Sequence, residues 1–409
     1  MHQVMFSGVV IAIVCVPAFL VFVWFSQIVA GCFALRRNRL SPTAAPVALF
    51  RTTVLIPAHD EGSGIFATLT DVKAQLGPRD SVLVVADNCT DETAEIVKAA
   101  GVDVAIRVDP TRRGKGYALE FGVRHLAINP PDVVVVLDAD CRLGEGALRQ
   151  LSGQAMQNGR PAQCLYLMLA PENAGAGNKV SIFAWRVKNW IRPLGLRLFG
   201  LPTQLFGTGM AFPFNLLLER DLGNSRLAED TAVGMSLAAA GYPPYFVSEA
   251  KVYSHFPVSQ AGSEQQRLRW EKGHLDNIID LVPGALAKSF RDGNLALAAL
   301  AIDMTIPPLS LLVFIVVFCE IFAGVLVALG TSFMALAISS ASILLLVFGT
   351  MLAWTTVGRD VLPFRDLLRL PLYAIRKIGM YRSISTGKAA SSWIRTDRMK
   401  APADENFEG

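Results

Sequence analysis

Two aspartates, Asp138 and Asp140, follow directly after a short apolar run at 133–137. The run holds only valine and leucine, which is the composition of a strand buried on both faces. Side chains alternate along an extended segment, so both carboxylates point to the same side. Paired hard oxygen ligands suit Mg²⁺ or Mn²⁺. The sequence therefore predicts a metal at this pair, with helix capping or simple solvation as the alternative.

Two further motifs are typical of nucleotide binding. Asp87 follows the apolar run at 82–85, where acidic residues of nucleotide-binding folds accept hydrogen bonds from a ribose. The alternative is a turn and helix cap formed by its neighbours, with Asp87 uninvolved. The segment 112–116, Arg-Arg-Gly-Lys-Gly, places cations before a predicted helix whose N-terminus favours anions. It predicts a phosphate site, and an exposed basic loop is the alternative.

The elements that must position these residues alternate along the chain. β-Branched apolar runs at 53–56, 82–85, 102–106 and 133–137 are separated by helical patterns at 64–75, 90–100 and 116–127. This order predicts an α/β fold with a doubly wound, mostly parallel sheet. Ligands bind at the carboxyl ends of such strands, where the acidic residues lie. Carboxylates gathered there repel one another unless a cation is bound.

Composition indicates a membrane protein, because 52% of the 409 residues are hydrophobic, 18% are charged and the mean hydropathy is +0.40. Apolar stretches at 9–35, 307–329 and 333–357 approach the roughly 20 residues of a spanning helix. Arg36, Arg37 and Arg39 follow the first stretch, and the tail after the third is basic. Basic flanks stay cytoplasmic, which predicts a multi-pass inner-membrane protein with a cytoplasmic middle domain.

Four regions are expected from these patterns. They are an N-terminal transmembrane helix with its basic flank at 1–40, a cytoplasmic catalytic domain at 41–295, a two-helix transmembrane hairpin at 296–358, and a basic interfacial helix with a cytoplasmic tail at 359–409. Aromatic and basic residues interleave at 185–192 and 367–382, which predicts amphipathic helices in the membrane interface. Glu320 lies within the second span, and the sequence names no partner for it.

Further features of the sequence bear on export and on partners. Val-Ala-Gly-Cys at 29–32 resembles a lipoprotein cleavage box, but no basic segment precedes the apolar run, as a signal peptide requires. The six cysteines show no paired spacing, so reduced thiols are expected and neither zinc nor a disulfide framework. The net charge of +4 is modest, and the basic residues flank membrane segments. Membrane lipids are the expected partner, and nucleic acid is not.

A dinucleotide site is a competing interpretation. Residues 62–67 fit the pattern G-x-G-x-x-G/A, with Asp87 downstream, which would make the chain a membrane-bound NAD(P)-dependent oxidoreductase. The first glycine of that fingerprint belongs in the tight turn after the strand. Here several residues, His59 and Glu61 among them, intervene, and the aspartate pair at 138 and 140 would have no role.

Taken in order, the motifs of residues 52–275 resemble those of membrane-bound family 2 glycosyltransferases with the GT-A fold, the branch of cellulose, chitin and hyaluronan synthases and ceramide glucosyltransferase. The resemblance runs through Pro57, His59 and Glu61 in a Pro-Ala-x-Asn-Glu motif, Asp87 as the nucleoside aspartate, Lys115 in Gly-Lys-Gly, Asp138 and Asp140 in Asp-x-Asp, Glu229 and Asp230 in Thr-Glu-Asp, and Gln266, Arg269 and Trp270 in Gln-x-x-Arg-Trp. Asp60 stands where the family has Asn, and Ala228 where it has Thr.

The resemblance implies a role for each of these residues. Donor contacts are expected from Pro57, His59, Glu61, Asp87, Lys115, Asp138, Gln266 and Arg269. Acceptor contacts are expected from Gly207, Thr208, Glu229 and Trp270, with packing as the alternative for the tryptophan. Asp138 and Asp140 would hold Mg²⁺ or Mn²⁺, and Asp230 would be the base of an inverting transfer from a nucleotide sugar, UDP being the expected carrier.

The acceptor expected from the resemblance is a lipid-linked or growing glycan in envelope or exopolysaccharide synthesis. Three spans are few for a processive synthase that exports its polymer. Single addition, or dependence on an export partner, is therefore favoured, with a processive synthase of the same fold as the alternative. A catalytically inactive scaffold is disfavoured, because every expected carboxylate is present.

Overall fold

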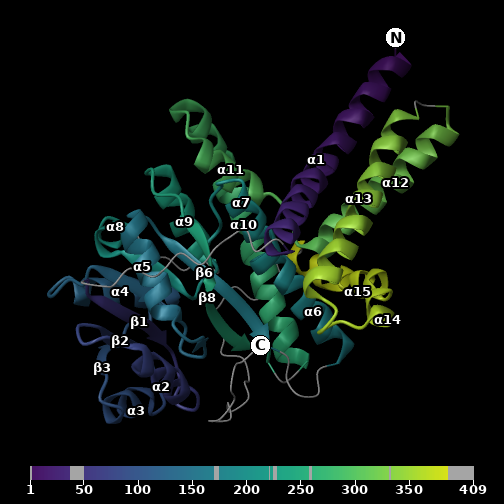
Figure 1. The fold of residues 1–409 in the computed structure, drawn as a ribbon. Helices are drawn as coiled ribbons and strands as arrows, with labels where there is room; N and C mark the ends of the chain where they lie inside the picture. The colour runs from purple at the N-terminus through teal and green to yellow at the C-terminus, as the bar shows by residue number, and fades with distance from the viewer. Residues whose placement is uncertain are drawn as a thin grey trace. The chain divides into compact units, whose positions relative to one another are not determined.

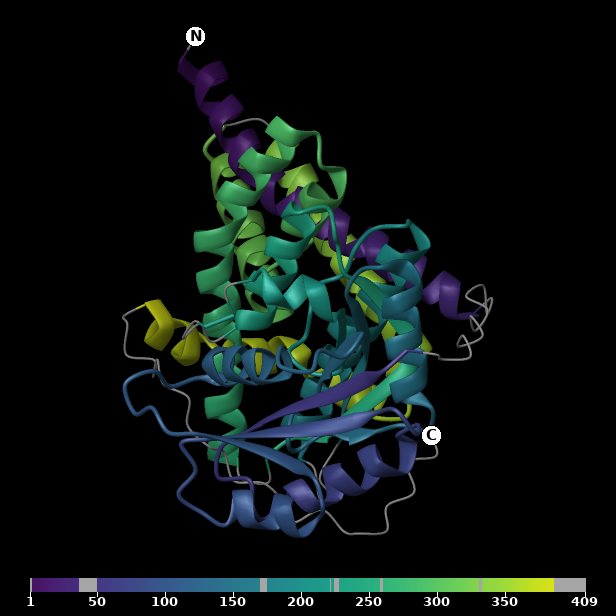
Figure 2. The same cartoon turned by 90° about the vertical axis from the view of Figure 1, so that its left-hand side faces the viewer.

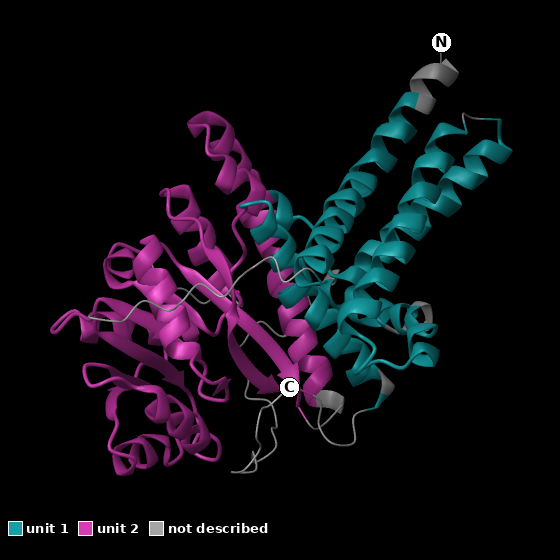
Figure 3. Cartoon of the chain, in the orientation of Figure 1, with its two compact units in different colours: residues 1–40, 174–200, 302–388 teal, residues 41–173, 201–301, 389–409 magenta. Residues whose placement is uncertain are grey.

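The computed structural model describes residues 2–36, 50–169, 175–220, 222–223, 228–257, 260–330 and 333–385. The chain divides into two compact units, coloured separately in Figure 3. Unit 1 comprises residues 1–40, 174–200 and 302–388, and unit 2 comprises 41–173, 201–301 and 389–409. The segment 174–200, which lies in sequence within the expected 41–295 domain, groups with the N-terminal and C-terminal helices.

Unit 2 is built on one sheet, whose strands are drawn as arrows in Figures 1 and 2. Its strands are β1 (Thr52–Ala58), β2 (Ser81–Asp87), β3 (Asp103–Arg107), β4 (Val133–Val136), β5 (Arg142–Leu143), β6 (Ala162–Leu169), β7 (Met210–Pro213) and β8 (Tyr245–His255). Their order in the sheet is β3-β2-β1-β4-β7-β6-β8-β5.

The first four strands confirm the doubly wound α/β prediction. β1 pairs in parallel with both β2 and β4, and β2 pairs in parallel with β3. The second half of the sheet is mixed: β7 runs antiparallel to β4 and β6, while β6 and β8 are parallel. β5 closes the edge antiparallel to β8. The switch of direction at β7 brings the loop before β7 to the carboxyl end of β4.

Helices cover both faces of this sheet. Those of unit 2 are α2 (Ile65–Gln75), α3 (Thr93–Ala99), α4 (Lys115–Leu126), α5 (Ala147–Asn158), α8 (Phe214–Leu218), α9 (Glu229–Ala239), α10 (Gln260–Asp292) and α11 (Leu295–Met304), whose end enters unit 1. Around the first three strands, α4 lies on one face and α2 and α3 on the other (Figures 1 and 2). One core packs Leu55 and Val85 of the sheet against Leu119 of α4 and Leu237 of α9. Burial of such side chains stabilises the domain by about 1.5–3 kcal/mol each.

Unit 1 contains the three predicted spans. Its helices are α1 (His2–Arg36), α6 (Ala176–Arg186), the π-helical η1 (Val187–Ile191), α7 (Arg192–Leu198), α12 (Leu309–Ala328), α13 (Met334–Val357), α14 (Phe364–Leu367), α15 (Leu370–Arg376) and α16 (Ile378–Ser385). Among the described helices, α1, α12 and α13 are long and apolar enough to cross a membrane. Two flanking arginines of α1, Arg37 and Arg39, lie outside the described residues.

The helices of unit 1 approach closely where α1 crosses α7. A Cβ on Gly195 would lie 2.1 Å from the backbone oxygen of Gln27, so only glycine fits, as at tightly packed membrane helices. Beside this crossing Arg192 is buried, and its guanidinium lies 2.7 Å from Asp303 and 2.7 Å from the Gln27 side chain. An interfacial helix at 185–192, as predicted from the sequence, would turn its basic side chains toward lipid headgroups. This is wrong for Arg192, because an ion pair holds it inside unit 1.

Glu320, for which the sequence named no partner, has two in the structure. Ser340 of α13 donates to its carboxylate at 2.7 Å, and the neighbouring Ser339 donates to its other oxygen. Both serines belong to the helix that follows in the hairpin, so the polar group of one span is satisfied by the next.

Candidate active site

The aspartate pair lies where β4 ends, as predicted. Asp138 and Asp140 are partly exposed, and together with the buried Cys141 they offer ligand atoms that all lie within 4.8 Å of one another. Burial raises the pKa of the Cys141 thiol, and the charge of Asp138 raises it further, so the thiol stays protonated. The two carboxylates therefore remain as hard oxygen donors, and this donor set fits Mg²⁺ or Mn²⁺.

Lys115 is the cation at the centre of the site. It begins α4, and its ammonium group donates to the carboxylate of Asp138 and, at 2.7 Å, to the carbonyl oxygen of Gly207. Glu229 lies 3.9 Å away. Burial alone would lower the pKa of Lys115, but the charges of Asp138 and Glu229 outweigh it and the pKa is raised. The lysine is therefore fully charged and neutralises carboxylates that come from two different elements.

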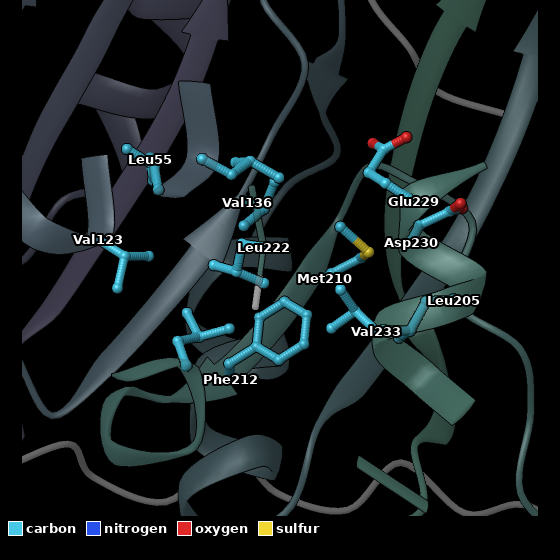
Figure 4. A pocket seen from close by; sticks show the side chains of 12 residues that line it. Leu55, Val123, Val136, Leu205, Met210, Phe212, Leu222, Glu229, Asp230 and Val233 are labelled. Carbon is cyan, nitrogen blue, oxygen red and sulfur yellow. The ribbon is translucent and has the colours of Figure 1, made fainter. Parts of the chain in front are cut away.

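Glu229 and Asp230 open helix α9, where the helix N-terminus favours negative charge. Glu229 is buried, and burial raises its pKa to about 7; the charge of Lys115 opposes this shift, whereas that of Asp230 adds to it. Figure 4 shows both carboxylates beside an apolar pocket lined by residues such as Met210, Phe212 and Val233. An apolar wall of this kind keeps water from one side of the acidic pair.

The glycine loop at 206–209 joins the same cluster. Gly207 has a φ of +86°, and a Cβ there would lie 3.5 Å from Asp230 and 3.6 Å from the Lys115 ammonium. The Thr208 hydroxyl accepts the backbone N–H of Asp138 at 3.0 Å. The structure thus brings together the predicted metal pair, the lysine, the Glu229-Asp230 pair and the loop expected to meet the acceptor.

Helix α10 packs against α9, the helix that begins with the acidic pair. Gln266 is buried, and its side-chain oxygen accepts no hydrogen bond from the described residues, which leaves one strong acceptor for a ligand. Burial lowers the pKa of Arg269, and the charges of Glu229 and Asp138 oppose that shift. Trp270 packs edge-on against Phe256, with ring centroids 6.5 Å apart, so the packing role is visible for this residue.

The expected nucleoside residues gather at the ends of β1 and β2. The ring of His59 is hydrogen-bonded to the backbone oxygen of Asp87 at 2.7 Å, and the backbone N–H of Glu61 donates to Thr93. Pro57 lies within β1, opposite Val85 of β2. The structure places these residues side by side, and direct contact with a nucleoside remains a prediction.

The sequence did not reveal the partner of Asp87. Its carboxylate is buried 2.5 Å from the guanidinium of Arg107, which also lies over the ring of Tyr117. Arg107 ends a strand whose other residues suggest nothing beyond β-structure, and only the pairing of β2 with β3 brings it beside Asp87.

These features can be compared with known proteins. The family model described as Glycosyltransferase like family 2 matches residues 50–273, more than half of the chain. The chain belongs to this family. Every residue of the cluster around Lys115 falls within the matched range, and the match favours glycosyl transfer over the dinucleotide alternative.

Two curated relatives carry the family across part of their length. The probable glycosyltransferase YdaM of Bacillus subtilis (strain 168) is 27% identical over 253 residues, which are 55% of this chain and 55% of that protein. The 4,4'-diaponeurosporenoate glycosyltransferase of Staphylococcus aureus (strain USA300) is 33% identical over 130 residues, 29% of this chain and 34% of that protein. The matches thus span about half the length of the first relative and about a third of the second.

One solved structure matches nearly the whole chain. The mannosyltransferase PcManGT from Pyrobaculum calidifontis, in complex with GDP-Man and Mn²⁺, aligns with a TM-score of 0.52 at 18% identity, over 93% of this chain and 99% of that one. At this identity the likeness shows the fold, and it confirms the GT-A-type α/β prediction.

Proposed function

We propose that this family 2 protein is an inverting glycosyltransferase that moves a sugar from a nucleoside diphosphate to a lipid-linked or growing glycan acceptor at the cytoplasmic face of the inner membrane. The observation that carries the proposal is the cluster of Asp138, Lys115 and the Glu229-Asp230 pair around one loop. It combines a metal-binding carboxylate pair, a cation for phosphate and a carboxylate for proton transfer.

The transfer is a single displacement in which each residue has one task. An acceptor hydroxyl oxygen bonds to the anomeric carbon while the bond from that carbon to the diphosphate breaks, and the hydroxyl proton passes to Asp230. The Glu229 carboxylate beside it fixes the position of Lys115. Arg269 is suited to meet phosphate oxygens through its planar fork.

Asp138 and Asp140 would hold the divalent cation. Bound there, Mg²⁺ or Mn²⁺ stabilises the charge that develops on the leaving diphosphate. The fit rests on the two oxygen ligands that converge at the end of β4. The mannosyltransferase of similar fold is in complex with Mn²⁺ and a guanosine donor, whereas the sequence resemblance favours uridine, so both nucleotides belong in the test.

The membrane assignment rests on the three apolar helices. Arg36 ends α1, and basic residues beside a span stay in the cytoplasm, which supports a cytoplasmic catalytic domain. We place that domain at 41–295, the hairpin at 296–358 and the basic interfacial segment at 359–409, with membrane lipids and an export machinery as candidate partners. Interfacial helices of this kind would bring the active site to a membrane-bound acceptor.

A donor screen tests this proposal. The purified protein is incubated with radiolabelled UDP- and GDP-sugars and a membrane lipid extract, with and without Mn²⁺. We expect metal-dependent labelling of a lipid product by the wild type.

Asp230→Asn should reduce transfer by at least about 100-fold, as loss of a general base does, while nucleotide binding persists. Asp103→Asn is the matched control, because Asp103 is an exposed aspartate at the start of β3. Near-normal transfer by Asp230→Asn would assign the base elsewhere.

A further inference from the structure

Gln163 is a buried amide that the proposed mechanism does not use. It lies on β6 between two strands, opposite Met210 of β7 and beside Phe246 of β8, and it has no exposed surface. The large majority of buried polar side chains are hydrogen-bonded. The partners of Gln163 therefore indicate what it does.

Apart from the carbonyl oxygen and the sulfur of the neighbouring Cys164, those partners are backbone groups of the glycine loop. The side-chain oxygen of Gln163 accepts the N–H of Phe206 at 2.8 Å, and its nitrogen donates to the carbonyl oxygen of Thr208 at 3.0 Å. The amide thus bridges the two ends of a three-residue turn centred on Gly207. Only a side chain with both a donor and an acceptor can make this bridge.

The outer side of the same turn holds the active-site groups. The carbonyl oxygen of Gly207 accepts from the Lys115 ammonium at 2.7 Å, and the Thr208 hydroxyl accepts the N–H of Asp138 at 3.0 Å. A shift of the turn would therefore move both the lysine and the start of the aspartate pair.

The turn rests directly on β6. Gly209 has a φ of +59°, and a Cβ there would lie 2.1 Å from the sulfur of Cys164. The N–H of Cys164 donates to the carbonyl oxygen of Gly209 at 2.9 Å. With no side chain between the turn and the strand, the Gln163 amide can reach across to the turn.

We infer that Gln163 is a positioning residue for glycosyl transfer: its amide fixes the 206–209 loop so that Lys115 stays against Asp138 and Glu229. The inference rests on the proposed function and adds a residue to it that touches neither substrate. Loss of the amide removes the partner of the part-buried N–H of Phe206 and of the buried carbonyl of Thr208, which favours movement of the turn to satisfy them. Displacement by about 1 Å near reacting groups lowers rates by about 100-fold.

The test compares Gln163→Leu and Gln163→Glu with the wild type, using the donor that the wild type accepts. Gln154→Leu is the matched control, because Gln154 is a buried glutamine of the same unit whose side chain accepts from Tyr245, outside the cluster. We expect Gln163→Leu to lower kcat by about 100-fold and Gln154→Leu to stay within about twofold. Measurable binding of a radiolabelled nucleoside diphosphate with Mn²⁺ shows that the variant is folded, which separates misplacement from unfolding.

The glutamate variant adds a readout that a purely structural role would not move. A neutral carboxyl carries one donor and one acceptor, as the amide does, whereas an ionised one only accepts. The ratio of Gln163→Glu to wild-type kcat should therefore fall as pH rises, and the ratio for Gln163→Leu should stay flat.

Two outcomes would overturn the inference. A Gln163→Leu variant that binds nucleotide fully and keeps kcat within twofold refutes it and leaves the proposed function intact. If that variant does not fold, a flat pH ratio for Gln163→Glu refutes it instead. A wild type that transfers no sugar refutes the proposed function itself, and the inference with it.

Discussion

Replacing Lys115 by methionine should change metal binding and glycosyl transfer in opposite directions. The Lys115 ammonium contacts Asp138, one of the two expected metal ligands, so in the nucleotide-free protein it opposes a divalent cation at that carboxylate. Methionine has a similar length and no charge. The variant should bind Mn²⁺ more tightly, yet lose the cation that meets the donor phosphates.

The size of the effect follows from distance and exposure. A unit charge 3.9 Å away, as between Lys115 and Glu229, interacts by about 4 kcal/mol at an effective dielectric of about 20. The side chains of Lys115 and Asp138 are 16% and 33% exposed, so solvent screens much of this energy. We therefore expect Mn²⁺ affinity to rise by about tenfold, or about 1.4 kcal/mol, and kcat to fall by about 100-fold.

Mn²⁺ titration of the nucleotide-free protein, with free Mn²⁺ measured by electron paramagnetic resonance, gives the first quantity. Lys73→Met is the control, because Lys73 is an exposed lysine that donates to the Ala100 carbonyl. Weaker or unchanged Mn²⁺ binding by Lys115→Met would show that Asp138 is not a metal ligand, or that Lys115 leaves it before the metal arrives.

Two stability predictions concern buried charges. Arg192→Met should destabilise the protein by about 3–5 kcal/mol, because it leaves the buried Asp303 without its positively charged partner. Adding Asp303→Leu should recover most of this loss in detergent unfolding, and additive losses would contradict the pairing. Burial raises the Glu229 pKa from 4.5 to about 7, so the stability that its proton contributes is present below about pH 4.5 and is lost as pH rises through 7. In metal-free protein, the melting temperature of Glu229→Gln minus that of the wild type should therefore increase as pH rises from about 5 to about 8. A difference that stays constant with pH would refute the raised pKa of Glu229.

The parts of the fold that sequence predicted are those that repeat one physical pattern. Three of the first four strands contain a continuous apolar run, as β4 at Val133–Val136 shows, the run of β3 is interrupted by Asp103, and each of the three intervening helices has regular apolar spacing. Two of the later strands are too short to carry such a signal. β5 has two residues and β7 has four, and their pairing depends on partners far away in the chain.

The site divides in the same way. Asp138 and Asp140 could be predicted because they follow directly after an apolar run, although they lie in a turn beyond the end of β4 and not within an extended strand. Gln163 and Arg107 could not, because Gln163 is identified only by its contacts with the 206–209 loop and Arg107 only by the pairing of two strands. Arg192 was misplaced at the surface for a related reason: its partner Asp303 lies 111 residues further along the chain, and a basic residue in an amphipathic stretch is otherwise expected to face solvent.

The charges of the cluster explain why donor and metal should bind together. Lys115 is held by Asp138, so in the free protein its ammonium is already satisfied by a carboxylate and by the Gly207 carbonyl. A diphosphate that approaches without metal meets the carboxylates of the aspartate pair and of Asp230, and like charges repel it. A divalent cation on the aspartate pair offsets that repulsion and weakens the attraction between Asp138 and the ammonium. Lys115 is then able to turn to the phosphate from a position that the Gly207 carbonyl still fixes, which is why the turn beneath it has to be rigid.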